Sequence, residues 1–287
     1  MSDRTSVSPA PRAPFRDPLT RRGPGLRPLD LAQWIEIDAA YEPQMALRDS
    51  LIGTRPALVA GIASGPLAAL GDAAVAEFWS VLTAHLAERQ KGVFLRQKGA
   101  IRRPDGVTVI ETGGIGALGR LVQEDWALLG AGADGVYRLI AGVICFPSRW
   151  RFRERLGAPL GALHAPVPHY AETLGPRVDR VFAAMRVETP LERANWTVHR
   201  SPELYQPARV ADAGGWWLRT ERQTLRRLPE TRAIVFGIKS AITPVAALDA
   251  DTRSALIEAV DALSGEEQSY KGLVGAAERM RREFTAG

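Results

Sequence analysis

The chain has 287 residues, of which 46% are hydrophobic and 24% are charged, a composition typical of globular proteins and sufficient for one large domain or two small ones. It contains no run of 18 apolar residues and no apolar segment of the secretory kind near its start. We therefore expect a cytoplasmic protein with no membrane span. The single cysteine, Cys145, excludes an internal disulfide and a cysteine-based zinc site.

The net charge of +5 raises the question of nucleic-acid binding, which requires basic charge concentrated on a folded face. Residues 1–25 carry a balance of +3, so the rest of the chain contributes only +2. The first 28 residues also contain six prolines, a composition that favours disorder. We therefore expect a disordered tail over residues 1–27 and no nucleic-acid partner.

Helical patterns dominate the part of the chain that follows. Asp30 is a suitable N-cap for a helix over residues 31–50, with a break expected at Pro43. Apolar side chains recur every three or four positions over residues 73–88, which predicts a helix with one buried face. Residues 92–111 predict an irregular hairpin that turns at a Pro-Asp-Gly sequence.

The central region changes to strand patterns. It predicts a hairpin (125–129 and 136–146), a helical stretch interrupted at Gly157 and Pro159 (149–163), a further helix (177–185) and three strands (193–200, 216–228 and 233–242). The short turn between the last two makes them antiparallel neighbours. The expected fold class is α+β, with a five-stranded antiparallel sheet and a helical crossover after the second strand.

Two helices, over residues 252–263 and near 276–284, are expected to close the chain. The expected organisation is a tail (1–27), a helical region with a hairpin (28–115), a core sheet (116–245) and C-terminal helices (246–287). A PAS domain has a compatible order of elements, although periodicity alone does not single it out.

Histidine is scarce, with only His85, His164, His169 and His199. His85 fits a boundary position on its helix. His164 ends a helical stretch before two prolines, which restrict the backbone and hold the direction of its imidazole. Such a histidine could ligate a metal, but one that bonds to the last helix carbonyls is the more usual arrangement. His169 lies in the same loop and is the alternative ligand. His199 lies on the polar face of its strand.

Arginines line the long strand expected over residues 216–228. By strand parity, Arg219 and Arg227 share one face while Arg222 and Arg226 share the other. Together with Arg149, which follows another strand, they could bind carboxylates or phosphates through paired hydrogen bonds. The other interpretation is surface pairing with nearby glutamates, which we expect for Arg226 and Arg227.

Common catalytic motifs are absent. The sequence contains no Gly-x-Ser-x-Gly, no Walker phosphate loop and no Gly-x-Gly-x-x-Gly, and the glycine-rich segment 113–116 is expected to be a flexible loop. Glu124 and Asp125 are adjacent in an expected strand start, so they face opposite sides and do not form an acid/base pair.

Several segments, taken together in order and spacing, resemble one bacterial family, that of haem-dependent oxidative N-demethylase. They are LRPLDLAQWIEID (26–38), LGRLVQEDWALL (118–129), YRLIAGVICFPSRW (137–150), LGALHAPVPHY (160–170), ANWTVHRSPELY (194–205), LRTERQTLRRLPETRAIVFGIKS (218–240) and YKGL (270–273). Each motif is weak alone, and their order across residues 26–273 is what identifies the family.

The resemblance implies a PAS-type sheet that holds haem b through a proximal histidine. His164 is the expected ligand, because it lies in the helical crossover where haem-binding PAS domains have theirs. Arg149 and Arg222 are the expected partners of the haem propionates, with Arg219 behind them.

The activity implied by the resemblance is O2-dependent removal of a methyl group from a small methylated amine. Hydroxylation of the methyl carbon gives a carbinolamine, which collapses to the amine and formaldehyde. Electrons would come from NADPH through a partner reductase with FMN and an iron–sulfur cluster, since one cysteine cannot ligate such a cluster. Glu124 and Asn195 are the candidates for the amine pocket, because a protonated amine requires an acceptor oxygen.

Two other functions remain compatible with the sequence. One is a haem-based gas or redox sensor, which would predict an output domain or a long signalling helix; the residues after Ile242 predict only helices that pack back on the core. The other is a relative that has lost haem and binds a different small ligand.

Overall fold

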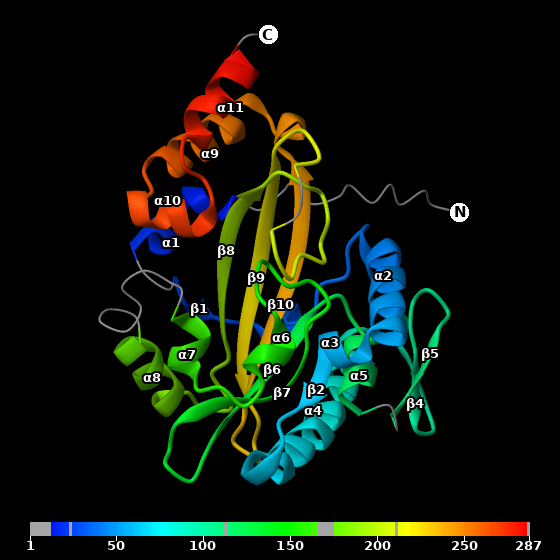
Figure 1. Ribbon diagram of the computed structural model, residues 1–287. Coiled ribbons are helices and arrows are strands. Elements are labelled where there is room, and N and C mark those ends of the chain that lie inside the picture. Colours follow the sequence, from blue (N-terminus) through cyan, green and yellow to red (C-terminus); the bar gives the residue numbers. More distant parts are fainter. Residues whose placement is uncertain (1–12, 23–24, 112–113, 166–174, 210–211, 286–287) are drawn as a thin grey trace.

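The structure, a computed structural model, describes residues 13–22, 25–111, 114–165, 175–209 and 212–285. At its centre is an antiparallel sheet in the order β1-β8-β9-β10-β6-β7-β2 (Figure 1). Its strands are β1 (Arg27–Pro28), β2 (Ala60–Ile62), β6 (Asp125–Ala131), β7 (Tyr137–Val143), β8 (Leu191–His199), β9 (Trp217–Arg227) and β10 (Ile234–Pro244).

The five longest strands form the predicted α+β core. β6 and β7 pair as the expected hairpin, the crossover follows, and β8, β9 and β10 complete the sheet with β10 against β6. The crossover helices are α6 (Phe152–Arg155), α7 (Leu160–His164) and α8 (Gly175–Ala184). The sheet is larger than the expected five strands, because the short β1 and β2 extend its two edges.

Strand alternation gives the sheet two different faces. On the crossover face, Leu225 and Ile234 pack with Leu160 of α7 and Phe182 of α8. The opposite face holds the larger core, in which Trp126 of β6 packs against helices α2 (Tyr41–Thr54) and α4 (Ala68–Arg89) and the segment around Trp34. A residue's parity in β8 or β9 therefore decides which of these environments its side chain enters.

The N-terminal region differs from the expectation in two places. The helix expected over 31–50 is split into η2 (Leu31–Gln33), which Asp30 caps, and α2, which begins at Tyr41. Pro43 lies in the first turn of α2, where a missing N–H breaks no helical bond, so the break comes before it.

The expected disordered tail is wrong for residues 13–22. They form η1 (Pro14–Arg16) and α1 (Pro18–Arg22), and Phe15 is fully buried with its ring 5.6 Å from that of Trp196. The burial of the single aromatic side chain, Phe15, thus orders a segment whose proline-rich composition favours disorder. Residues 1–12 are outside the described part.

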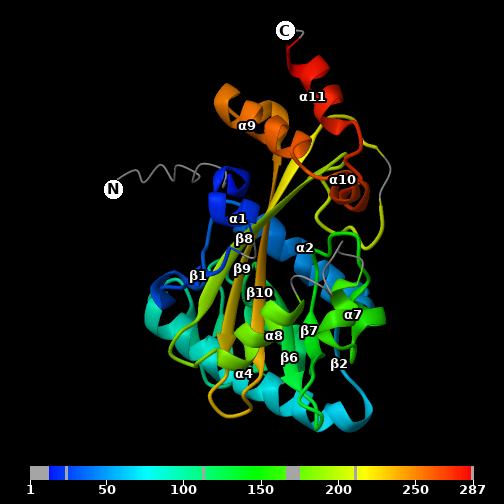
Figure 2. The same ribbon diagram turned by 90° about the vertical axis from the view of Figure 1, so that its left-hand side faces the viewer.

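The C-terminal helices pack on the β8–β9 end of the sheet (Figures 1 and 2). They are α9 (Ala250–Asp261), α10 (Gly265–Lys271) and α11 (Ala276–Thr285), preceded by η6 (Val245–Ala247). α9 and α11 were expected from the sequence but α10 was not. Ser264 and Glu267 form a capping box at the start of α10, and Gly272 ends it in the left-handed conformation.

The remaining elements lie on the opposite face and beside it. They are α3 (Pro56–Val59), η3 (Gly65–Leu67), β3 (Leu95–Gln97), β4 (Ala100–Arg102), β5 (Thr108–Ile110) and α5 (Gly114–Gly119). The expected hairpin over 92–111 is a separate three-stranded sheet, β3-β4-β5. The expected glycine-rich loop begins helix α5, which the buried Ile115 and Leu118 anchor in the core.

One stretch within the described ranges, Gly65–Arg89, is long and apolar enough to cross a membrane by composition alone. In this fold it contains α4, whose Phe78, Leu82 and Leu86 are fully buried against the sheet.

Candidate functional site

His164 is the last residue of α7, over the crossover face of the sheet. Its Nδ1 lies 3.1 Å from the carbonyl oxygen of Leu160, one turn earlier. A carbonyl can only accept, so Nδ1 bears the proton and Nε2 has the lone pair that a metal requires. Burial, aided by the charge of Arg193, lowers the pKa of the imidazole, which favours its neutral form. His164 could therefore bond to a helix carbonyl through Nδ1 and ligate a metal through Nε2, so the two roles are compatible.

Arg193 of β8 is the charged group that acts on His164, and sequence reasoning missed it. Its side chain makes no hydrogen bond or ion pair with any described residue, and its buried Nε has no partner. Burial lowers its pKa, and the charge of Glu221 opposes this. A half-buried guanidinium without a protein partner can bind an anion, which would complete its hydrogen bonds. Arg193 shares the parity of Asn195, which could have indicated its position.

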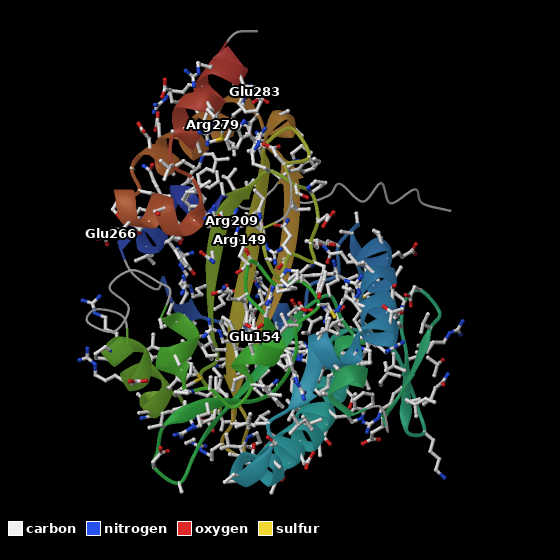
Figure 3. All side chains as sticks on the ribbon, in the orientation of Figure 1. Arg149, Glu154, Arg209, Glu266, Arg279 and Glu283 are labelled. Atoms are coloured by element: carbon white, nitrogen blue, oxygen red, sulfur yellow. The ribbon has the colours of Figure 1, made fainter. Side chains whose placement is uncertain are left out.

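Arg149 follows the end of β7 and lies beside the end of α10. Its Nη1 donates to the carbonyl of Lys271, its backbone N–H donates to that of Gln206 at 2.6 Å, and its buried Nε has no partner in the described chain. Burial lowers its pKa, as does the charge of Arg209, which lies close by (Figure 3). Arg149 also has a left-handed backbone (φ 62°), a costly conformation that is common at functional sites.

Asn195 and Glu221 face each other across β8 and β9, on the crossover face. The Asn195 amide donates to Oε2 of Glu221 at 3.4 Å, and Gln223 donates to the same oxygen at 2.9 Å. The negative charge of Glu221 also acts on Lys271 and Tyr270 of α10. Burial lowers the pKa of Lys271, whose Nζ donates to the carbonyl of Trp196 at 2.9 Å. Glu221 is thus the acidic centre of a mostly basic group.

Arg219 has the parity of this face but is fully buried with its hydrogen bonds already made. It donates to the carbonyls of Phe146 and Leu204, to the Ser240 hydroxyl at 3.0 Å and to Glu221 at 3.3 Å. A ligand that recruited Arg219 would have to break these bonds. Its position indicates an anchor between the sheet and the loop after β7.

Arg222 and Glu124 lie on the opposite face, apart from His164. Arg222 pairs with Glu192 at 2.6 Å and donates to the carbonyl of Trp34 at 3.0 Å. Glu124 is buried, neither carboxylate oxygen has a partner in the described residues, and desolvation raises its pKa to about 7. The structure therefore does not bring these two expected site residues together with the histidine.

His199 lies on the crossover face as well, where the charges of Arg149, Arg219 and Glu221 act on it, whereas His85 lies on the opposite face beside Trp34. His199 is buried, with Nδ1 2.8 Å from Oε1 of Gln206, and burial lowers its pKa to about 4. His85 is buried on α4 against the ring of Trp34, and burial lowers its pKa to about 4 as well. His169, the alternative ligand, is outside the described residues.

Comparison with known protein families identifies the family of this chain, which the geometry of the site alone does not. A family model described as haem-dependent oxidative N-demethylase, alpha subunit-like, matches residues 25–280. The chain belongs to this family. The match spans the central sheet, the crossover and the C-terminal helices, so the N-demethylase-like unit includes every residue of the group described above.

The residues on the crossover face fit the haem that the family description names. A neutral imidazole with its Nδ1 proton held by a carbonyl suits an iron ligand, and the haem propionates suit two half-buried guanidiniums with unpartnered Nε atoms. His164, Arg149 and Arg193 are the residues of this region that would supply such a donor set.

Proposed function

We propose that this chain is the haem-binding component of an oxidative N-demethylase that removes a methyl group from a small methylated amine. The proposal rests on family membership, and the observation that supports it is the position of His164 on the crossover face, with its Nδ1 3.1 Å from the carbonyl oxygen of Leu160. We further propose that residues 116–245 form the haem-binding core, flanked by regions 28–115 and 246–287.

His164 would hold the iron of haem b through Nε2, and Arg149 and Arg193 would bind the propionates. This set revises the expectation from sequence: Arg193 replaces Arg222, which faces the other side, and Arg219 supports the loop behind Arg149. Haem, when bound, supplies the oxygen-activating redox chemistry.

The amine would bind near Asn195 and Glu221. A protonated amine entering this face needs an acceptor, and the Glu221 carboxylate with the Asn195 amide oxygen provides one. Glu221 thus takes the role expected for Glu124, while Asn195 keeps its role. Hydroxylation of the methyl carbon yields a carbinolamine, which releases formaldehyde.

The overall reaction consumes O2, two electrons and two protons, and gives the demethylated amine, formaldehyde and water. The electrons would reach this chain from NADPH through a partner reductase with FMN and an iron–sulfur cluster. The only cysteine, Cys145, is fully buried, so the chain itself is unsuited to ligate such a cluster. We propose a cytoplasmic location, where NADPH-linked partners operate.

Titration of the purified chain with haemin, followed by absorption spectroscopy, tests the haem. We expect one equivalent to bind with a histidine-ligated spectrum, and His164→Ala to lose that spectrum, while His85→Ala keeps it. A His164→Ala variant with full haem and unchanged spectra would contradict the ligand assignment. Formaldehyde release with a surrogate reductase and a panel of methylated amines then separates an enzyme from a haem sensor, and failure to bind haem would favour a haem-free relative.

A further inference from the structure

The β3-β4-β5 sheet lies at the side of the molecule beyond α2, away from α7 and α8 (Figure 1). Its inner face is fixed to the body, since Phe94, Ile101 and Val109 are buried in the larger core. Arg103 strengthens this attachment by binding Asp49 at 2.9 Å. The sheet is thus a rigid part of the surface.

The outer face of this sheet exposes aliphatic side chains. Strand register places Leu95, Arg102 and Thr108 in one row and Gln97, Ala100 and Ile110 in the next. Leu95 is 47% exposed and Ile110 61%, and Val93 and Val107 beside them are 37% and 42% exposed. These are four of the ten large hydrophobic residues exposed within the described ranges. Their concentration on one small sheet indicates a contact surface.

The same surface is strongly basic. Lys91, Arg96, Lys98 and Arg102 are all exposed, and their side chains make no hydrogen bond or ion pair with any residue the structure describes. The acids nearby do not balance them, because Asp105 is paired with Arg103 and the exposed Glu88 with Arg89, which leaves the exposed Glu111. Of these four cations, the strand register places Arg102 on the outer face; Arg96 shares its row with the buried Ile101 and Val109, and Lys91 and Lys98 lie just outside β3. The outer face therefore presents Arg102 beside its aliphatic side chains, with further exposed positive charge at its border.

A recess of about 350 Å³ lies at the turn end of this sheet. Its lining includes Val93, Leu95, Pro104 and the exposed Arg102. An aliphatic wall beside an unpaired guanidinium suits a side chain that ends in a carboxylate.

We propose that the outer face of the β3-β4-β5 sheet is the docking surface for an acidic partner protein with an aliphatic patch at the centre of its contact. The family description, an alpha subunit, itself implies another chain. This inference does not depend on haem, because the sheet lies apart from the crossover face.

Two other occupants fit less well. A second copy of this chain would bring two unpaired basic faces together, which like-charge repulsion disfavours. Nucleic acid would match the charge, but the exposed side chains of this face include no aromatic ring on which bases could stack, and aliphatic side chains offer it little. Lysine on edge strands also deters edge-to-edge aggregation, but that role does not explain the exposed Leu95 and Ile110.

Site-specific cross-linking identifies the occupant. The full chain with p-benzoylphenylalanine at position 110, or at the control position Val136, which is 42% exposed, is irradiated in cells of its source organism, and adducts are identified by mass spectrometry. We expect one acidic protein at position 110 and not at 136. That protein, purified, should bind the unmodified chain. Absence of a specific adduct, or an adduct with the chain itself or with nucleic acid, would overturn the proposal.

Variants of the surface then test the contact with the purified partner. Lys98→Glu/Arg102→Glu should weaken binding at least tenfold at about 0.1 M salt, where the Debye length is about 10 Å. The matched charge change Arg186→Glu/Arg232→Glu should leave binding within about twofold. Leu95→Ser/Ile110→Ser should weaken binding even at high salt. All three variants should keep the circular dichroism and haem binding of the parent, so that loss of docking is distinguishable from loss of the proposed function. Equal weakening of binding by the two charge variants would contradict the assignment of the docking surface.

Discussion

Arg48 and Asp125 form an ion pair inside the protein, with Nη1 and Oδ1 2.7 Å apart and both side chains almost fully buried. Arg48 also donates to the carbonyls of Gly119, Gln123 and Glu124, while Asp125 accepts from the backbone N–H groups of Cys145 and Phe146. The pair therefore ties α2 to the start of β6 and the end of β7.

Removing one partner of this pair should be costly. We expect Arg48→Met to lower the free energy of unfolding by about 3–5 kcal/mol, because it leaves the Asp125 carboxylate buried without its cation. Urea unfolding measures the change, and Arg89→Met, at a half-exposed arginine, should change stability by less than about 0.5 kcal/mol. A loss below about 1 kcal/mol for Arg48→Met would show that the pair is not a structural anchor.

Glu124 should make stability depend on pH. Burial raises its pKa from 4.5 to about 7, so the folded state holds a proton that the unfolded state releases above pH 4.5. The stabilisation is fully present below pH 4.5 and is lost as pH rises through 7, a change of about 3 kcal/mol at most. His85 and His199, with pKa values lowered to about 4, act in the opposite sense at acid pH.

The comparison of parent and Glu124→Gln isolates this effect. Between pH 5 and pH 8 the parent should lose more unfolding free energy than the variant, while Glu111→Gln, at an exposed position, should follow the parent. Parallel pH profiles for the parent and Glu124→Gln would rule out the buried proton.

Arg193 should matter for haem and not for folding. Because its guanidinium has no partner in the described structure, Arg193→Met should leave the stability of the haem-free chain unchanged or slightly raised. It should raise the Kd for haemin roughly ten- to hundredfold, the loss of a charge-assisted contact of about 1.5–3 kcal/mol. Arg222→Met should show the reverse, with lower stability and unchanged haemin affinity, because its charge is used by Glu192. Identical effects of the two substitutions would contradict the division between the faces.

Gly142 of β7 should not tolerate a side chain. A Cβ there would lie 2.8 Å from the Trp126 carbonyl oxygen and 2.8 Å from the ring of Phe152. We expect Gly142→Ala to destabilise the protein by about 1–3 kcal/mol, because the backbone of β6 cannot move away. Gly161→Ala, which meets no atom within 4 Å, is the matched control. Thermal melts that coincide for the two variants would disprove the close approach.

Cys145 should be unreactive in the native state. It is fully buried, and burial raises the pKa of its thiol to about 12, so almost no thiolate is present at neutral pH. We expect no reaction with a thiol reagent such as DTNB until the chain is unfolded in denaturant, and then one equivalent. Rapid labelling of the folded protein would show that this core opens.

Much of the fold could be predicted from the sequence, because its strands have strong local signals. The alternation in β8 to β10 was sufficient to predict three strands, and the short turn after Arg227 was sufficient to predict that β9 and β10 pair. The spacing of Phe78, Leu82 and Leu86 was sufficient to predict α4. The edge strands β1 and β2 were missed, since two or three residues have no periodicity. Their pairing depends on tertiary contacts.

The candidate site was less predictable. Strand parity correctly placed Arg219 and Arg222 on different faces of the sheet, but it could not predict which face the crossover helices cover. Arg193 was overlooked because its significance comes from what it lacks, a partner, and that is visible only in three dimensions. The sequence offers Glu221 only as one of the glutamates near the strand arginines, whereas in the structure its charge acts on both Lys271 and Tyr270.

The burial of Phe15 beneath the C-terminal helices has a consequence for how the chain is made. Phe15 packs in the same cluster as Leu256 and Met280, residues at the other end of the sequence. During synthesis Phe15 therefore cannot pack in this cluster until the segment that contains Leu256 and Met280 has left the ribosome. Loss of either end by proteolysis would uncover one shared apolar surface, so trimming at one terminus should release the other.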